Sequence, residues 1–222
     1  MTHLEAELDQ LKNAVVDMAF LTANQLEKSK EAFIHMDADI AEEVIHNERR
    51  VNAMELSIDR DCENIFALFN PVASDLRFVI AVLKINSDLE RIADYADGIS
   101  KYVVDFGSPI QEDMKEANNL ANMFDLAVSM TRDITTAFEY EDATLARKVY
   151  KKDAELNRIN QNASNVISEF VAENTDTIRQ MLFLFSTIRK LERVGDHVKN
   201  VAEDLVFYLE AEVLKHNKNK KN

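Results

Sequence analysis

The stretch Leu89-Glu90-Arg91-Ile92-Ala93-Asp94 has a near copy later in the chain, Leu191-Glu192-Arg193-Val194-Gly195-Asp196. The two copies begin 102 positions apart, since 191 − 89 = 102, and each follows an apolar segment with an arginine at the same offset, Arg77 or Arg179. Two matching acidic segments indicate a duplicated fold that carries two equivalent sites.

The composition favours an all-α fold. The 222 residues include only 3 glycines and 2 prolines, too few for a sheet protein with many tight turns. Hydrophobic residues make up 46% of the chain, which is enough for a packed core.

The charge and the single cysteine exclude several classes of protein. With 26 Lys and Arg against 40 Asp and Glu, the net charge is −14, which argues against a general nucleic-acid-binding protein because such proteins neutralise phosphates with basic patches. Cys62 stands alone, so neither an intrachain disulfide nor a cysteine zinc cluster is possible. With no signal peptide and no bilayer-spanning apolar segment, we expect a cytoplasmic location.

Apolar spacing predicts six long helices. The first covers about residues 4–36, the second runs from Asp37 or Asp39 to about 69, and the third starts with Pro71 in its first turn and reaches about 105. The remaining three are expected to reach about residue 138, to run from about 141 or 142 to 172, and to run from about 175 or 176 to 215.

The segment Gly107-Ser108-Pro109 is the strongest interruption of this pattern, so we place a domain boundary there. Residues 1–106 and 107–222 are each predicted to form an antiparallel three-helix bundle, and the second ends in a frayed basic tail. A single extended coiled coil is the competing structure, and Pro71 and Pro109 argue against it.

Acidic residues form stripes on two neighbouring predicted helices. At about 100° per residue, Glu90, Asp94 and Asp97 share one face, and Asn86 extends it. A similar stripe on the preceding helix consists of Glu48, Asn52, Glu55 and Asp59. Acids four positions apart repel each other unless a cation lies between them, and carboxylates are oxygen ligands for magnesium, calcium, manganese or iron. The alternative is an ordinary solvated face.

The second half is less acidic. Its last helix presents Glu192, Asp196 and Lys199 on one stripe, and the helix before it offers Asp153 followed by Asn157. A lysine does not suit a cation site unless its long stem carries the ammonium away. If both halves bind metal, the second is expected to bind fewer ions or to bind them more weakly.

Other patterns carry less weight. Glu43-Val44-Ile45-His46 has the Glu-x-x-His form found in di-iron bundles, but such sites need two copies and only one is present. His197 follows Asp196 and is either a further metal ligand or a surface histidine. The chain has no phosphate-binding loop of the P-loop type and nothing that indicates an enzyme.

The chain resembles the PhoU family of phosphate-signalling regulators over nearly its whole length. The resemblance is carried by Pro71-Val72-Ala73-Ser74-Asp75-Leu76-Arg77-Phe78, by Val51-Asn52-Ala53-Met54-Glu55 and by the two acidic repeats. It implies a pair of three-helix bundles, with a Glu/Asp-x-x-x-Asp motif in each half that holds metal ions. The metal ligands that it implies are Glu48, Glu90, Asp94, Asp153, Glu192 and Asp196.

The resemblance also implies a role without catalysis. Such proteins negatively regulate phosphate uptake and the phosphate-starvation response, as adaptors between the ATPase of a phosphate ABC transporter and a sensor histidine kinase at the inner face of the membrane. A homodimer is expected, and iron, zinc, manganese and magnesium all remain open as the metal. The alternatives are a regulatory partner of a sodium-coupled phosphate carrier, a metal-buffering or metal-dependent protein, and a structural helical scaffold.

Overall fold

The fold is all-α, as the sequence predicts. The computed structural model describes residues 2–107 and 109–211, and no strand occurs among them. The helices are α1 (His3–His35), α2 (Ala38–Phe69), α3 (Ala73–Phe106), α4 (Glu112–Ala117), α5 (Leu120–Glu139), α6 (Ala143–Glu173) and α7 (Ile178–Glu210), and a 3-10 turn (Thr175–Thr177) precedes α7.

Short side chains fix where several helices begin. Asp37 accepts a hydrogen bond from the Ile40 amide at 3.0 Å at the start of α2, and Asp142 accepts one from the Leu145 amide at 2.9 Å at the start of α6. Each bond satisfies an amide that the first helical turn leaves without a partner. Of the two start residues predicted for each helix, the structure confirms Asp37 for α2 and Asp142 for α6.

The structure corrects the predicted helices in two places. The expected fourth helix is broken into α4 and α5, because Asn119 adopts a left-handed conformation with φ 51°, which asparagine tolerates better than most residues. Pro71 lies in the connection before α3 rather than in its first turn, since Val72 caps that helix. The predicted end of the last helix near residue 215, and the basic tail, lie outside the described residues.

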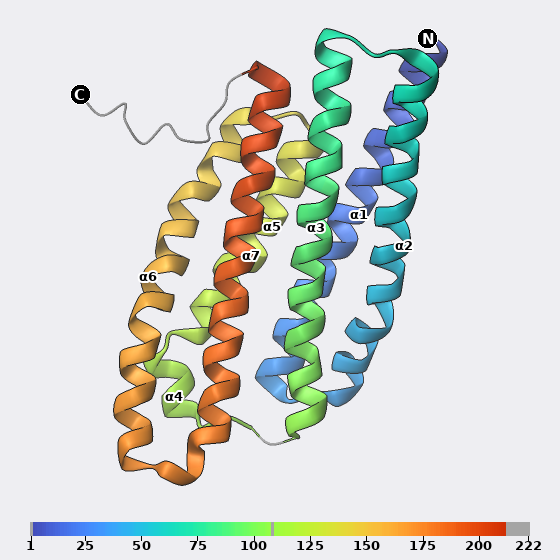
Figure 1. The fold of residues 1–222 in the computed structure, drawn as a ribbon. Helices are drawn as coiled ribbons and strands as arrows, with labels where there is room; N and C mark the ends of the chain where they lie inside the picture. The colour runs from blue at the N-terminus through green and yellow to red at the C-terminus, as the bar shows by residue number, and fades with distance from the viewer. Residues whose placement is uncertain (1, 108, 212–222) are drawn as a thin grey trace, which may run out of the picture.

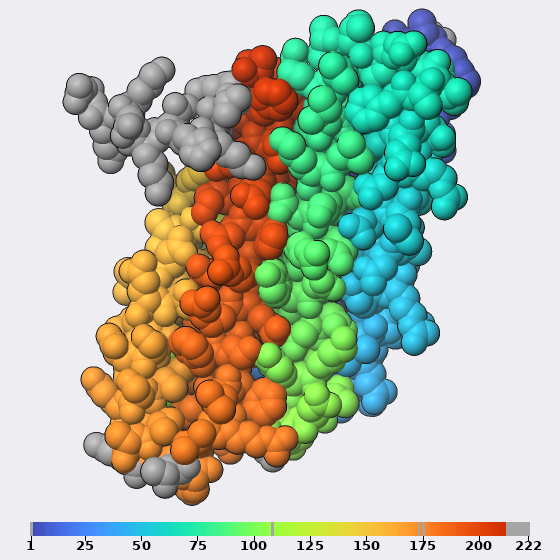
Figure 2. Space-filling model, in the orientation of Figure 1, coloured from blue at the N-terminus to red at the C-terminus, as the bar shows by residue number. Residues whose placement is uncertain are grey.

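The helices form two layers (Figure 1). In the front layer α6, α7, α3 and α2 lie side by side, and α5 and α1 lie behind them. The front layer forms one continuous face (Figure 2). Antiparallel α1–α2–α3 and α5–α6–α7 are the two three-helix bundles, and they meet where α3 packs on α7 and α1 on α5.

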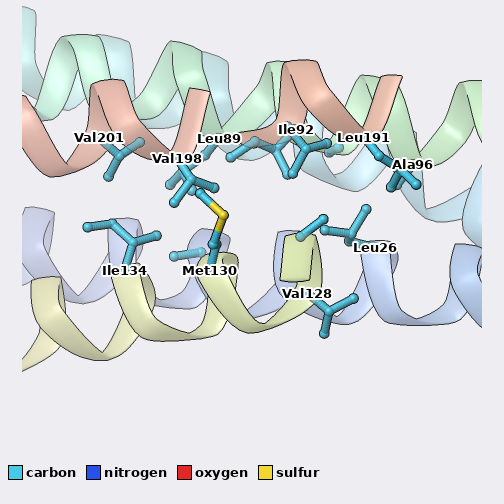
Figure 3. Packing of buried hydrophobic residues seen from close by; sticks show 14 of the residues in the cluster. Leu26, Leu89, Ile92, Ala96, Val128, Met130, Ile134, Leu191, Val198 and Val201 are labelled. Atoms are coloured by element: carbon cyan, nitrogen blue, oxygen red, sulfur yellow. The ribbon is translucent and has the colours of Figure 1, made fainter. Parts of the chain in front are cut away.

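One apolar core lies between the layers. Figure 3 shows Leu89 and Ile92 of α3 and Val198 of α7 facing Leu26 of α1 and Met130 of α5. All five side chains are buried. The core is shared by both bundles, so no gap in the packing separates them among the described residues. The domain boundary near residue 107 stays a prediction.

Polar contacts also join the two bundles. Lys84 of α3 pairs with buried Asp204 of α7 at 3.0 Å, and the Tyr102 and Ser186 hydroxyls are 2.6 Å apart. Among the residues described, no helix has the length and apolar character needed to cross a membrane.

Candidate metal site

The fold brings the two predicted acidic stripes of the first half face to face. α2 and α3 are adjacent, and the Asn86 side-chain amide of α3 donates hydrogen bonds to the Glu55 carbonyl oxygen and to Asp59 Oδ1 of α2, both at 2.9 Å. This amide fixes the register of the two helices. The acidic residues on either side therefore meet across the groove instead of pointing to separate faces.

Three of the predicted ligands come together in this groove. Each of Glu48, Glu90 and Asp94 offers a carboxylate oxygen within 4.8 Å of the other two. Both carboxylate oxygens of Glu48 are buried and accept no hydrogen bond from any described residue. Arg91 pairs with two of the three acids, at 3.5 Å from Glu90 and 3.2 Å from Asp94, but its side chain is 56% exposed and lies at the edge of the cluster.

Burial and the mutual repulsion of the carboxylates dominate the electrostatics of the groove. Burial, together with the charges of Asp94, Asp97 and Glu90, raises the pKa of Glu48 from its ordinary 4.5 to about 7. The pKa of Glu90 is also raised, by burial first and then by Asp94. Protonation relieves the repulsion at low pH, and a bound cation would relieve it at neutral pH.

Asp97 belongs to the surroundings of this cluster although it was not among the predicted ligands. It is only 6% exposed, and its Oδ2 atom pairs with Lys101 at 2.6 Å while Oδ1 has no partner among the residues described. Its place on the acidic stripe was visible in the sequence. Its burial was not, because that depends on how closely α2 packs on α3.

This set of residues fits a metal ion. Carboxylate oxygens from two rigid helices are suitable ligands for magnesium, manganese or iron, and zinc also accepts them. The buried, unpartnered oxygens of Glu48 are the observation that favours an ion over a solvated face, because a buried carboxylate without a partner is costly.

The corresponding residues of the second half are arranged differently. Asp153 of α6 and Asp196 of α7 do face each other, but the Lys199 ammonium lies between them, 3.2 Å from Asp153 Oδ2 and 3.1 Å from Asp196 Oδ1. The long stem of Lys199 therefore does not carry its charge away from the motif. Glu192 lies beside this group, and its pKa is raised by burial and then by Asp196. That this half binds metal remains a prediction.

Gly195 is explained by a close approach of helices. A β-carbon added there would lie 2.6 Å from Leu156 Cδ1 and 3.3 Å from Asp153 Oδ1. The helix that approaches Gly195 is thus α6.

The two histidine candidates do not join the carboxylate cluster. The Nδ1 atom of His197 lies 2.6 Å from Asp88 Oδ1, so this side chain links α7 to α3 instead of extending the acidic motif. Glu43 of the Glu-x-x-His segment pairs with Lys28 of α1. His46 lines an open hollow of about 500 Å³ beside Glu48, together with Arg49 and Lys101.

Comparison with known proteins identifies the family. The sequence model of the PhoU domain matches this chain twice, at residues 15–103 and 120–205. The chain belongs to the PhoU family. The phosphate-specific transport system accessory protein PhoU of Edwardsiella tarda is 31% identical over 211 residues, which cover 95% of this chain and 86% of that protein.

Solved structures of the PhoU family agree with the fold. The crystal structure of PhoU from Pseudomonas aeruginosa superposes with a TM-score of 0.88 at 28% identity and covers 95% of this chain and all of its own. That of the phosphate transport system regulatory protein PhoU from Streptococcus pneumoniae gives a TM-score of 0.81 at 27% identity, over 96% and 99% of the two chains. PhoU proteins are regulatory accessory proteins and not a catalytic family, in agreement with the prediction that the chain is not an enzyme.

Proposed function

We propose that this protein negatively regulates phosphate uptake and phosphate-starvation signalling, as a metal-binding adaptor between a phosphate ABC transporter and a sensor histidine kinase. Its similarity to the Edwardsiella tarda accessory protein extends over nearly the whole of both chains, which supports a role beside a phosphate transporter. The role places the protein at the inner face of the membrane, attached through its partners.

The observation that carries the mechanism is the cluster of Glu48, Glu90 and Asp94. A bound ion would neutralise these carboxylates and hold α2 against α3, whereas the empty cluster repels itself across the groove. The presence or absence of the ion would therefore change the helical face that the partners contact. Regulation by changed contacts needs no chemical reaction.

A binding experiment tests the adaptor role. The purified protein, first treated with EDTA and then with MnCl2, is titrated against the transporter ATPase and against the cytoplasmic part of the kinase by calorimetry. We expect both partners to bind, with at least a tenfold difference in affinity between the metal-loaded and the metal-free protein. Glu90→Ala/Asp94→Ala should bind both partners as the metal-free protein does. Glu63→Ala, an exposed change on α2, is the matched control.

A cellular experiment separates this function from the alternatives. Removing the gene should switch on the starvation response in phosphate-rich medium, and the native protein should restore repression. If repression is normal without the protein but cellular metal content changes, metal buffering is the better account. If a sodium-coupled phosphate carrier binds and the ABC transporter does not, the partner is wrong while the regulatory role stands.

We also propose that the protein acts as a homodimer, as the resemblance to its family implies. Light scattering of the full chain across a concentration series tests this. A mass of about one chain at every concentration would contradict it.

A further inference from the structure

The duplication places opposite charges at several equivalent positions of the two halves, and one of these positions belongs to the acidic motif. A shift of 102 positions aligns Glu90 with Glu192 and Asp94 with Asp196, and the same shift aligns Asp97 with Lys199. The acid that lies beside the first cluster is thus replaced in the second half by a base. The same shift also aligns Asp88 with Lys190 and Lys101 with Glu203, so the charge is reversed at three positions. Of the bases and acids that this introduces in the second half, Lys199 is the one whose ammonium lies between Asp153 and Asp196.

Lys199 is built into the second motif by its contacts. Its ammonium contacts Asp153 and Asp196 on two different helices, and its side chain is only 26% exposed. Asn157 donates a further hydrogen bond to Asp153 Oδ2 at 3.2 Å. The Lys199 ammonium donates hydrogen bonds to Asp196 Oδ1 at 3.1 Å and to Asp153 Oδ2 at 3.2 Å, so the two carboxylates share one cation.

We propose that Lys199 is a tethered cation that occupies the second acidic motif in place of a metal ion. The second half is then neutralised at every metal concentration, and the protein takes up metal through the first half alone. The part of this inference that concerns the first half rests on the metal-binding role proposed above.

The physical reason is competition for the same oxygens. An ion bound between Asp153 and Asp196 would have to displace the Lys199 ammonium or lie within a few ångströms of it, where like charges repel strongly. Because the ammonium belongs to the same helix as Asp196, it is always present at the site and is not diluted. In the part of the first half that the structure describes, no cation pairs with Glu48. Arg91 contacts Glu90 and Asp94 from the edge of the cluster, and Lys101 pairs with Asp97.

Reciprocal exchanges at the equivalent positions test the proposal. The full chain is stripped with EDTA and titrated with MnCl2, and free Mn²⁺ is measured by electron paramagnetic resonance. We expect Glu192→Ala/Asp196→Ala to bind as much Mn²⁺ as the native protein, and Glu90→Ala/Asp94→Ala to bind none. Lys199→Asp should gain Mn²⁺ beyond the native amount, and Asp97→Lys should lose at least tenfold in Mn²⁺ affinity in the first half. Circular dichroism checks that each variant is folded.

A stability measurement gives a readout that does not depend on metal in the native protein. In EDTA, Lys199→Ala should unfold at a lower urea concentration than the native chain, because Asp153 and Asp196 then face each other without a cation. Added MnCl2 should restore the midpoint of Lys199→Ala. Lys199→Arg, which keeps the positive charge, should stay closer to the native midpoint than Lys199→Ala does.

The outcomes distinguish the two proposals. If Glu192→Ala/Asp196→Ala loses a share of the Mn²⁺ that the native protein binds, the tethered-cation inference is overturned while the metal-binding role stands. If the native protein binds no Mn²⁺ at any concentration, the metal-binding role fails. The urea unfolding of Lys199→Ala in EDTA then tests by itself whether Lys199 neutralises the second motif. An unchanged urea midpoint for Lys199→Ala in EDTA would overturn the inference in either case.

Discussion

Gly195 of α7 lies so close to Leu156 of α6 that the two residues leave no room for a β-carbon between them. Leu156 is completely buried, so its methyl group has little freedom to move aside. At the equivalent position of the first half, Ala93 is accommodated although it is also buried. The second bundle is therefore packed more tightly at its acidic motif than the first.

Gly195→Ala is expected to destabilise the protein by up to about 2 kcal/mol. Overpacking a core costs about 1–3 kcal/mol, and the better helix propensity of alanine returns about 1 kcal/mol of that. Urea unfolding followed by circular dichroism measures the difference. Gly98→Ala is the matched control, because the added methyl would meet only the movable end of Lys190, and it should be neutral or stabilising. A more stable Gly195→Ala variant would show that α6 gives way easily.

The stability of the metal-free protein should fall as pH rises from about 4.5 to about 7. In the folded protein the pKa of Glu48 is raised from 4.5 to about 7, so between these pH values the folded state binds a proton that the unfolded state has released. Protonated Glu48 therefore stabilises the folded state at low pH, and this stabilisation is lost as pH rises through about 7. Urea midpoints in EDTA at several pH values test this. Glu48→Gln should flatten the slope in this window, and Glu63→Gln should not. If Glu48→Gln leaves the pH dependence of the urea midpoint unchanged, other titrating groups are responsible for that dependence.

Asn86→Ala should cost about 2 kcal/mol. The side chain is fully buried and its amide donates to the Glu55 carbonyl and to Asp59 on α2, so its removal takes a donor away from two partly buried acceptors. The measurement is again the free energy of unfolding in urea. Asn52→Ala, a change at an exposed position of α2, should stay within about 0.5 kcal/mol of the native value. Equal effects of the two changes would mean that Asn86 does not fix the register.

The pair of Lys84 and Asp204 offers a test of the contact between the two bundles. Lys84→Ala leaves the buried Asp204 carboxylate without its cation, and we expect a loss of about 1–2 kcal/mol, moderated because Lys84 is 50% exposed. Lys84→Met/Asp204→Leu removes both charges and should recover most of that loss. If the double variant is less stable than Lys84→Ala, the attraction between Lys84 and Asp204 itself stabilises the contact between the bundles, beyond neutralising the buried Asp204 carboxylate.

Much of the fold could be predicted because the helices are long and strongly patterned. Apolar periodicity and the capping residues Asp37 and Asp142 define α2 and α6 well. The break at Asn119 escaped prediction because asparagine is compatible with a helix interior, and its left-handed conformation is visible only in three dimensions. The first residue of α3 was predicted too early, because proline is common in the first turn of a helix and Pro71 was assigned to that turn. In the structure Pro71 lies just before the capping residue Val72.

The part of the candidate site that follows from the sequence repeat and from helical periodicity could be predicted. The repeat identifies Glu90 and Asp94, and the stripe on α2 contains Glu48. Sequence alone could not decide where the Lys199 ammonium lies, because a lysine stem is long enough to reach either solvent or a neighbouring carboxylate. It also could not reveal the burial of Asp97, which results from the distance between two packed helices.

The adjacency of α3 and α7 has a mechanical consequence. α3 has 34 residues, so it is a rod of about 50 Å, and a tilt of about 5° around its middle moves each end by about 2 Å. Close-packed helices shift as bodies, so α7 must accommodate any tilt of α3 along their shared side. A small tilt near the middle of α3 would therefore give its largest displacements at the helix ends and at the turns that follow them.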